Sequence, residues 1–458
     1  MRNRFPMLRK LVLLTGDICL LLVATYLAVV IVFYGNTPRL ISGSYYNMLP
    51  VMIITAGILF NINGLFSLVR KKYSELLLSL AVALFNLFII MMAASFFLRE
   101  FSYSRGVLIV TMILQFILLA VWKYIFWRME RARIIPQNAL IIGSQSECVR
   151  VIARLNAQPQ LNYEVRYICT DCDSEPWKKV AEDIDLIIVC AGLSLSDKAD
   201  IVHFCHVNGK QVFLIPNVYE LFCSGVELDK FDDIPVFRPQ YLKPTLEQRS
   251  LKRILDLTIT GAALLLFLPL CILITIAIKL DSPGPVLYKQ VRTGRDEKKF
   301  KVYKFRTMRQ DAEKITGPVL AAENDPRITS LGRFLRATRI DELPQLFNVF
   351  LGDMSIVGPR PERPFFVEQF KKEIPEYVYR HNVKPGITGM AQVYGKYNTT
   401  PYNKLVYDLI YIQKCNVLTD IVIMLQTVKI LVTKSSTEGV ISNKVKLDLA
   451  MYQIEKIG

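Results

Sequence analysis

Four long apolar segments, separated by short polar ones, open the chain. They cover residues 11–34, 48–69, 76–98 and 106–127. Each comes close to the roughly 20 apolar residues that a helix needs to cross a bilayer. The pattern therefore predicts four transmembrane helices within residues 1–134.

The basic residues around these segments predict their orientation. Most of them precede the first segment, separate the second from the third or follow the fourth (Arg2, Arg4, Arg9, Lys10, Arg70, Lys71, Lys72, Arg128, Arg131 and Arg133). The opposite loops carry Arg39, Arg99 and Arg105. Because cytoplasmic loops hold the excess of Lys and Arg, both ends of the bundle should be cytoplasmic. A signal peptide is the alternative for the first segment, but that segment is too long and lacks a small-residue cleavage site.

One acidic residue, Asp17, falls inside the first apolar segment. Ionisable residues within a membrane often mark a functional site. Asp17 is close to the predicted cytoplasmic end, however, so we expect it to reach the membrane interface without a functional role.

A fifth apolar segment, residues 254–278, differs from the others because Pro269 lies near its centre. Proline removes one helical hydrogen bond and clashes with the preceding turn, so a break is expected. Lys252, Arg253 and Lys279 flank both ends of this segment. We therefore predict a re-entrant helix that enters one leaflet, bends at Pro269 and returns to the cytoplasmic face. A straight, kinked span is the alternative.

Residues 135–248 follow a different pattern, in which short β-rich runs alternate with helical ones. Residues 139–142, 163–169, 185–189 and 211–215 predict strands, and 149–155 and 197–207 predict helices between them. This order indicates a parallel, doubly wound, Rossmann-like sheet. Of the Gly-x-Gly-x-x-Gly dinucleotide fingerprint only Gly143 is present, and Glu147 places a negative charge where a phosphate would lie. We expect a structural, regulatory or dimer-forming domain, with nucleotide binding as the alternative.

The same region holds a weak zinc pattern. Cys169, Cys172, His203, Cys205 and His206 include enough thiolate and imidazole groups for one ion. The single Cys-x-x-Cys pair has no second paired half, so ordinary sheet and helix residues are the preferred interpretation.

Composition agrees with a membrane protein that handles anions. The 458 residues allow about three domains, 52% of them are hydrophobic, and the formal net charge is +16. The basic residues adjoin apolar segments and Pro-Arg motifs, and no nucleic-acid-binding motif is found, so lipid and phosphate explain this charge better than nucleic acid. The nine cysteines predict no disulfide framework.

Short polar motifs follow the fifth apolar segment. They are Asp281-Ser-Pro-Gly-Pro285, Tyr303-Lys-Phe-Arg-Thr-Met308, Asn324-Asp-Pro-Arg327, Thr338-Arg-Ile-Asp-Glu-Leu-Pro-Gln345, Val357-Gly-Pro-Arg-Pro-Glu362 and Lys384-Pro-Gly-Ile-Thr-Gly389. Asp341 precedes a run with helical spacing whose first turn contains Pro344, so we expect Asp341 to cap that helix. Helix N-termini also favour anions, and guanidinium groups match phosphate oxygens, which points to phosphate chemistry. The arginines concerned are Arg333, Arg336, Arg339 and Arg360.

In this order the motifs resemble those of the bacterial sugar transferase family, the polyprenyl phosphate phosphoglycosyl transferases, over about residues 248–435. The resemblance implies a bacterial inner-membrane enzyme whose α-rich catalytic domain, residues 249–458, lies on the cytoplasmic face. The front half resembles the large members that start exopolysaccharide, capsule or O-antigen repeat units. A homodimer is also considered.

The resemblance implies a reaction in two displacements. The family's catalytic Asp-Glu pair corresponds to Asp341 and Glu342. Asp341 would attack the sugar-proximal phosphate of a UDP-sugar and release UMP, and polyprenyl (undecaprenyl) phosphate would then attack the phosphosugar adduct. Mg²⁺ is the expected cofactor, with Asp341 as its ligand. The predicted phosphate contacts are Lys304, Arg306, Arg336, Arg360 and Lys396. Glu342 is either a general base or a support for the pair.

Several positions depart from the family pattern. Arg339 and Ile340 stand where Ser-Leu is usual, Met390 where Trp is common, Lys396 where Arg is frequent, and Leu268 where Ser often precedes the proline. A lysine at 396 cannot bind a phosphate in the bidentate way of arginine. These differences affect details of the site and leave the reaction class unchanged.

Other classes of protein fit the sequence less well. A membrane nucleotide-sugar dehydratase would need an intact glycine fingerprint and a Tyr-x-x-x-Lys pair, and the pair found is Tyr452 and Lys456 in the extreme tail. A non-enzymatic membrane scaffold leaves the C-terminal motifs unexplained.

Residues 405–432 are apolar with interspersed charges, which suits either interfacial helices or a soluble core helix. The sugar itself is not readable from the sequence.

Overall fold

The computed structural model describes residues 6–33, 43–100, 104–133, 135–170, 176–239, 242–308, 327–396, 399–432 and 455–457. The chain divides into two compact units. The first contains Met1–Ile215 with Val445–Gly458, and the second contains Pro216–Lys444.

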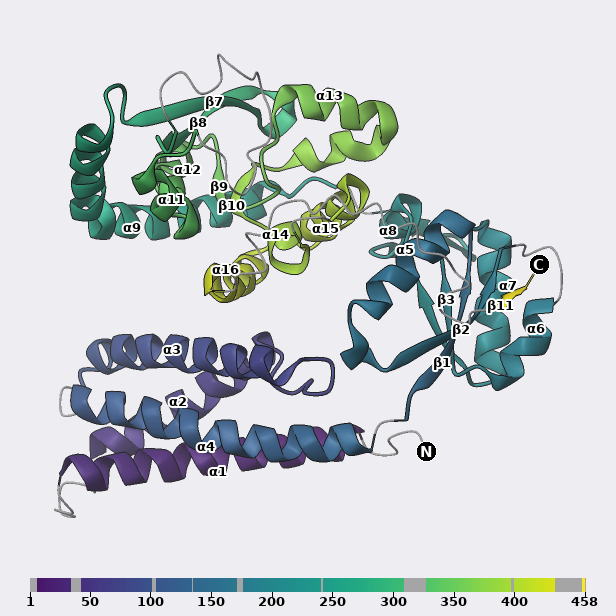
Figure 1. Ribbon diagram of the computed structural model, residues 1–458, viewed down its shortest axis with the longest axis horizontal. Helices are drawn as coiled ribbons and strands as arrows, with labels where there is room; N and C mark the ends of the chain where they lie inside the picture. The colour runs from purple at the N-terminus through teal and green to yellow at the C-terminus, as the bar shows by residue number, and fades with distance from the viewer. Residues whose placement is uncertain are drawn as a thin grey trace. The chain divides into compact units, whose positions relative to one another are not determined.

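Four long helices begin the first unit where the apolar segments predicted them. They are α1 (Pro6–Val32), α2 (Gly43–Ile62), α3 (Tyr73–Phe97) and α4 (Arg105–Ala132). Helix α4 packs along α1 and α3, and α2 packs along α3 (Figure 1). In the described part of the chain, these four helices and α9 of the second unit are long and apolar enough to cross a membrane. The chain is thus a membrane protein with a soluble α/β part.

The expectation that Asp17 reaches the membrane interface is wrong. Its Oδ2 lies 2.6 Å from Nζ of Lys123 on α4, and each side chain is only 1% exposed. Lys123 also donates to the carbonyl of Leu65. A buried charge is stable only when it is paired. The bundle therefore supplies a partner that is 106 residues away in the sequence.

The parallel sheet predicted between residues 139 and 215 is confirmed. Its strands are β1 (Gln137–Ile142), β2 (Tyr163–Cys169), β3 (Leu186–Val189) and β4 (Gln211–Leu214), and helices α5 (Gln145–Asn156), α6 (Pro176–Val180) and α7 (Leu195–Val207) connect them. Alternate residues of β1 face opposite sides of the sheet. Leu140 and Ile142 pack with Ile201 of α7, while Ala139 and Ile141 pack against α5.

A fifth strand joins this sheet from the end of the chain. Strand β11 (Glu455–Ile457) pairs in parallel with β2, so the order is β11-β2-β1-β3-β4. It contains Lys456, while Tyr452 lies outside the described residues. So short a segment carries no periodic signal, and the sequence did not predict it.

The residues of the zinc alternative lie in ordinary positions. Cys169 and Cys205 are buried in one hydrophobic cluster with Trp177, and Cys172 lies outside the described residues. Among the side chains that the structure describes, no three His, Cys, Asp or Glu residues are grouped as metal ligands.

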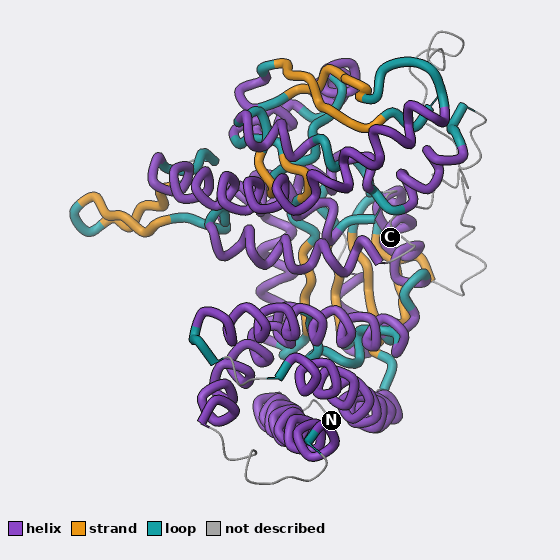
Figure 2. Tube along the Cα trace, turned by 90° about the vertical axis from the view of Figure 1, so that its left-hand side faces the viewer, coloured by secondary structure: helices purple, strands orange, loops and turns teal. Residues whose placement is uncertain are grey.

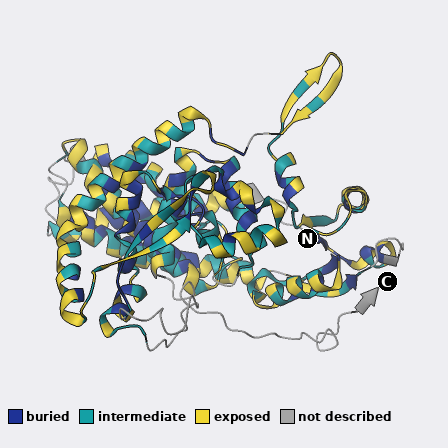
Figure 3. Cartoon of the chain, turned by 90° about the horizontal axis from the view of Figure 1, so that it is seen from above, coloured by how far each residue is buried: buried dark blue, intermediate teal, exposed yellow. Residues whose placement is uncertain are grey.

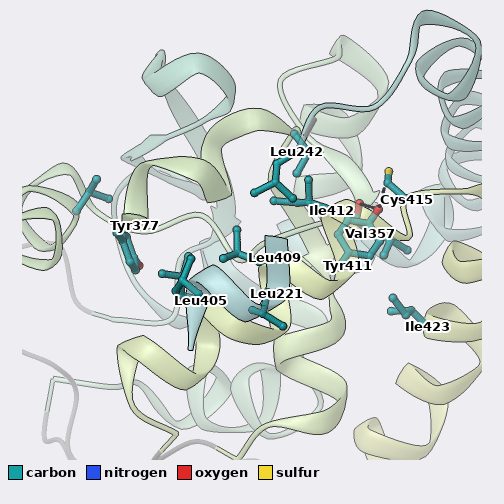
Figure 4. Packing of buried hydrophobic residues seen from close by; sticks show 13 residues of the cluster. Leu221, Leu242, Val357, Tyr377, Leu405, Leu409, Tyr411, Ile412, Cys415 and Ile423 are labelled. Atoms are coloured by element: carbon teal, nitrogen blue, oxygen red, sulfur yellow. Dashed lines mark hydrogen bonds between the residues drawn. The ribbon is translucent and has the colours of Figure 1, made fainter. Parts of the chain in front are cut away.

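The core of the second unit contains an apolar cluster to which several elements contribute. Helices α8 (Val218–Cys223), α15 (Pro401–Gln413) and α16 (Val417–Val432) and strand β9 (Ser355–Val357) contribute to it. Leu405, Leu409 and Tyr411 of α15 are fully buried there (Figure 4). Residues 405–413 thus form a core helix, whereas α16 leaves Leu418 and Leu431 exposed.

Two hairpins belong to this unit. Strands β5 (Glu227–Phe231) and β6 (Ile234–Arg238) form a hairpin that projects from its neighbours (Figure 2) and is largely exposed on both faces (Figure 3). Strands β7 (Leu287–Thr293) and β8 (Lys299–Phe305) form the other. The remaining elements are α11 (Ser330–Ala337), α12 (Gln345–Leu351), α13 (Pro364–Glu373), α14 (Met390–Tyr394) and β10 (Gly386–Thr388), which pairs with β9.

The fifth apolar segment forms α9 (Leu246–Asp281), a helix of 36 residues that contains Pro269. Figure 1 shows that it turns sharply partway along its length. Near its start, Arg253 donates to the carbonyl oxygens of Val349 (2.7 Å) and Phe350 (2.8 Å) of α12. Near its end, Ile274 and Ile278 pack in a cluster with Phe305 and Leu335. A straight helix of this length would span about 54 Å, so the bend returns both ends to the same unit.

Candidate active site

The Asp341-Glu342 pair lies in a single 3₁₀ turn, Ile340–Glu342, between α11 and α12. Arg339, which precedes the turn, has a left-handed backbone with φ of 56°, an uncommon conformation for a side chain of this size. Helix α12 begins only after Pro344, which is its N-cap. The expectation that Asp341 caps this helix is therefore wrong, because Glu342 and Leu343 lie between Asp341 and the N-cap.

The two carboxylates occupy different environments. Asp341 is only 9% exposed, and burial raises its pKa, although the cation of Lys304 opposes the shift. Glu342 Oε1 accepts hydrogen bonds from Lys304 Nζ at 2.6 Å and from Arg360 Nη2 at 3.2 Å. Burial alone would raise the pKa of Glu342, but Arg360 and Lys304 hold it well below its usual range. Glu342 thus stays ionised and anchors two cations beside Asp341.

Three separate segments bring these groups together. Lys304 comes from β8, the carboxylates precede α12, and Arg360 follows β9. Asn348 of α12 joins two of them, since its Oδ1 accepts from Tyr303 N–H (3.0 Å) and its Nδ2 donates to the Lys301 carbonyl (2.8 Å). These bonds fix β8 against α12 and so align Lys304 with Glu342. Asn348 is completely buried, and a buried amide must be fully hydrogen-bonded to be stable.

A buried ion pair holds the segment that carries Arg360. Arg380 lies 2.9 Å from Asp408 of α15 and donates to the backbone carbonyl of Arg360 at 3.0 Å. It also donates to the hydroxyl of Tyr377 at 2.8 Å. The side chain of Arg360 remains 47% exposed, so this segment is fixed while the side chain is open to solvent. Sequence analysis did not single out Asn348, Arg380 or Asp408, because none belongs to the motif cores.

The other predicted phosphate contacts differ in position, and of these Arg336 lies close enough to Asp341 for its cation to lower the pKa of that carboxyl. Arg306 is buried and donates to the carbonyl oxygens of Ser282 (2.6 Å) and Pro283 (3.0 Å), where it secures the end of α9. Its phosphate contact stays a prediction, and in this structure backbone acceptors engage its guanidinium. Arg336 donates through Nε to Thr307 Oγ1 at 2.8 Å. Lys396 is exposed after α14, and in the described part of the chain no contact joins it to the carboxylate pair. Of the Asn324–Arg327 motif, only Arg327 is described.

One side of the carboxylate pair faces α9. Ile340 and Leu343, which flank the pair in sequence, pack in the same apolar cluster as Leu270, Ile274 and Ile278. The apolar helix that the sequence assigns to the membrane thus lies directly against the turn that carries the Asp341-Glu342 pair.

Comparison with known proteins identifies this arrangement. The family model described as "Bacterial sugar transferase" matches residues 247–434, the segment that contains the carboxylate pair, Lys304 and Arg360. A protein of Aeromonas hydrophila named UDP-N-acetylgalactosamine-undecaprenyl-phosphate N-acetylgalactosaminephosphotransferase is 34% identical over 75% of this chain and 77% of its own length. The chain belongs to the bacterial sugar transferase family.

Other members of the bacterial sugar transferase family match over shorter stretches. The UDP-glucose:undecaprenyl-phosphate glucose-1-phosphate transferase of Escherichia coli (strain K12) is 42% identical over 47% of this chain and 48% of its own length. The undecaprenyl-phosphate glucose phosphotransferase of Komagataeibacter xylinus is 34% identical over 68% of this chain and 62% of its own. The chain thus spans about half to three quarters of the length of these three relatives.

A second family model, described as "CoA-binding domain", matches residues 61–193. The carboxyl ends of the parallel strands surround a cavity of about 560 Å³, lined among others by Gly143, Arg150 and Asp197. The Glu147 carboxylate lines this cavity and accepts hydrogen bonds from Ser144 Oγ (2.8 Å) and from the Gly192 N–H (3.2 Å). A bound phosphate would need backbone N–H donors of this kind, so the Glu147 carboxylate would compete with a phosphate for the Gly192 N–H.

Proposed function

We propose that this protein transfers a sugar 1-phosphate from a UDP-sugar to undecaprenyl phosphate through a covalent phosphosugar on Asp341. The observation that carries the proposal is the buried Asp341 carboxylate beside Glu342, Lys304 and Arg360. A desolvated carboxylate is a stronger nucleophile than a hydrated one, and cations beside it reduce its repulsion from a diphosphate. The products would start a polysaccharide repeat unit.

In the first step, a carboxylate oxygen of Asp341 forms a bond to the sugar-proximal phosphorus. The bond between that phosphorus and the bridging oxygen breaks, and its electron pair leaves on UMP. In the second step, a phosphate oxygen of undecaprenyl phosphate attacks the same phosphorus and the acyl phosphate bond breaks. This restores the carboxylate and gives undecaprenyl diphosphate sugar. No external proton donor is needed in either step.

Lys304 and Arg360 have distinct tasks in this proposal. Both contact the same oxygen of Glu342, so Glu342 positions them and acts as a support instead of a general base. The half-exposed Arg360 can share its second face with a donor phosphate while it keeps this contact. The charge that leaves with UMP is thus compensated where it develops.

The donor set of the site fits Mg²⁺. This ion is usually held by one or two carboxylates together with substrate phosphates, and Asp341 and Glu342 present adjacent carboxylates. We propose Asp341 as the Mg²⁺ ligand, and Glu342 is the next residue in the sequence. When bound, the ion would neutralise diphosphate charge and polarise the reacting phosphorus.

The function is tested with the full-length protein in detergent or liposomes, supplied with UDP-sugars, undecaprenyl phosphate and Mg²⁺. We expect UMP release and a lipid-linked sugar, and we expect EDTA in excess over the metal to reduce the rate by at least about a hundredfold, with recovery on adding Mg²⁺. Release of UDP instead of UMP, or full activity in EDTA, would contradict the mechanism. UDP-glucose, UDP-galactose and their N-acetylated forms are all supplied, because the phosphate site does not select among them.

We further propose that α1–α4 cross the cytoplasmic membrane and that α9 enters it from the cytoplasmic face and returns. The support is that both ends of α9 are fastened to the same unit, while side chains between them, such as Leu265 at 77% exposure, meet no protein partner that would bury them. Exposed leucines on such a helix are stable in hydrocarbon. The active site then lies at the cytoplasmic surface, where soluble and lipid substrates meet.

A cysteine-accessibility experiment tests the re-entrant model. A cysteine placed at Asp296, which is exposed in the short turn between β7 and β8, should react with a membrane-impermeant maleimide only after the inner membrane is opened. A cysteine at Glu100, after α3, should react in intact spheroplasts. Labelling of the Asp296 position from outside would instead establish a straight span.

The homodimer stays a prediction. The feature that supports it is the β5–β6 hairpin, which exposes Leu228, Phe231, Ile234 and Phe237. A two-stranded hairpin is only marginally stable in water without packing partners.

A further inference from the structure

One face of the β7–β8 hairpin carries a row of polar side chains that the phosphate chemistry does not use. In the antiparallel register, Tyr288 lies opposite Lys304, and Gln290 and Arg292 follow at every second position of β7. Opposite residues in such a pair, and alternate residues along a strand, point to the same side. Tyr288, Gln290 and Arg292, called here the β7 row, therefore share the face of Lys304.

Hydrogen bonds connect the members of the β7 row. Arg292 Nη2 donates to Gln290 Oε1 at 2.5 Å, and Gln290 Nε2 donates to the Tyr288 hydroxyl at 3.1 Å. The orientation of each group is thus fixed by its neighbour, as a preformed ligand site requires. All three side chains keep solvent exposure and none is fully buried.

The far end of the β7 row reaches the segment that carries Arg360. Arg292 Nη1 donates to the carbonyl oxygen of Pro361 at 3.0 Å, and its guanidinium lies 3.7 Å from the Glu362 carboxylate. Burial lowers the pKa of Arg292, and the nearby cations of Arg360 and Arg363 lower it further. The β7 row therefore begins beside Lys304 and ends beside Arg360, the two cations that contact Glu342.

The β7 row and α9 serve different approaches to the catalytic turn. The apolar cluster of α9 contacts Ile340 and Leu343, which suits the lipid acceptor. The β7 row leads from Lys304 along the strand away from the end of α9, since Leu287 is the residue of β7 nearest to that end in sequence. A water-soluble donor whose phosphates contact Lys304 and Arg360 would place its other groups along the β7 row.

We propose that Tyr288, Gln290 and Arg292 form the subsite for the uncharged, hydroxyl-bearing rings of the nucleotide-sugar donor. The inference rests on the proposed function and deepens it. Amide, phenol and guanidinium groups offer both donors and acceptors, which hydroxyl and ring carbonyl groups need. The rings can be the hexose or the uridine of the same donor, and the two are separated by experiment.

Two substitutions test the β7 row in the full-length protein. Gln290→Leu keeps the volume and removes both polar atoms, and Tyr288→Phe removes only the hydroxyl. Each should raise the KM for the UDP-sugar, by about tenfold for Gln290→Leu, because a site built to bind hydroxyl groups loses affinity when its polar partner is removed. The kcat and the KM for undecaprenyl phosphate should change by less than about twofold. A merely structural role would alter kcat and lipid KM as well.

Inhibition by UMP distinguishes whether the β7 row binds the uridine or the hexose, because UMP contains the uridine and lacks the hexose. If the β7 row binds uridine, the inhibition constant of UMP rises with the donor KM. If it binds the hexose, UMP inhibition is unchanged and the preference among UDP-sugars that differ at one hydroxyl shifts. Either result supports the subsite.

The matched control is Val291→Thr, an exposed position of the same strand on the opposite face, which should keep the wild-type donor KM. Wild-type donor KM in both Gln290→Leu and Tyr288→Phe would overturn the proposal, and if Gln290→Leu loses its melting transition, Tyr288→Phe decides alone. A thermal-shift titration with UDP-glucose measures the affinity for the donor without requiring turnover. Wild-type protein that binds UDP-glucose but releases no UMP from UDP-glucose, UDP-galactose or their N-acetylated forms would sink the proposed function, and the titration of the variants would still decide on the β7 row.

Discussion

The Asp341→Asn variant is expected to release no UMP and to form no lipid-linked sugar, a loss of at least about a thousandfold. Asparagine has nearly the same shape and remains neutral at every pH, so the buried turn should fold as before. It cannot form an acyl phosphate under these conditions, and both displacements depend on that bond. The measurement is UMP release from a UDP-sugar, with and without undecaprenyl phosphate.

The same experiment detects the adduct directly. Wild-type protein incubated with UDP-sugar alone should yield a peptide containing Asp341 with the added mass of a sugar phosphate, and Asp341→Asn should not. Asp353→Asn, an exposed aspartate just after α12, is the matched control and should retain full activity. Wild-type rates in Asp341→Asn would require another nucleophile and would end the proposed mechanism.

The Glu342→Gln variant should lose about a hundredfold in kcat, a smaller effect than removal of the nucleophile. The Glu342 carboxylate holds Lys304 and Arg360 together on one oxygen. A neutral amide leaves two adjacent cations without their shared counter-ion, so both move away from the position that the reacting phosphate needs. The loss should appear in single-turnover formation of the phosphosugar adduct.

Glu368→Gln is the control for this prediction, since Glu368 is a largely exposed carboxylate of α13 whose side chain is 70% exposed. If Glu342 were instead a general base for the acceptor, the first step would be normal in Glu342→Gln and only the second would be slow. The adduct would then accumulate in the presence of undecaprenyl phosphate. That outcome would assign Glu342 a catalytic role in place of the supporting one.

Local patterns in the sequence determined much of the architecture. Apolar length predicted α1–α4, short β-rich runs predicted β1–β4, and Pro269 predicted the bend of α9. The motif order also pointed to the Asp341-Glu342 pair, Lys304 and Arg360, which the fold brings together. The helices, strands and bend depend on residues near one another in the chain, whereas the site residues were predicted from the resemblance to a known family.

Only the tertiary structure decided which distant groups meet. Asp17 pairs with Lys123 at a separation of 106 residues, and Asn348 aligns β8 with the catalytic turn across 45 residues. Arg306 has the same residue type as Arg360, yet the first secures the end of α9 and the second faces the site. Charge and hydrogen-bonding capacity are visible in a sequence, but the partner that satisfies them depends on how remote segments pack. For that reason the sequence pointed to the reaction class and to the candidate carboxylate Asp341, whereas the contacts of the neighbouring arginines emerged from the fold.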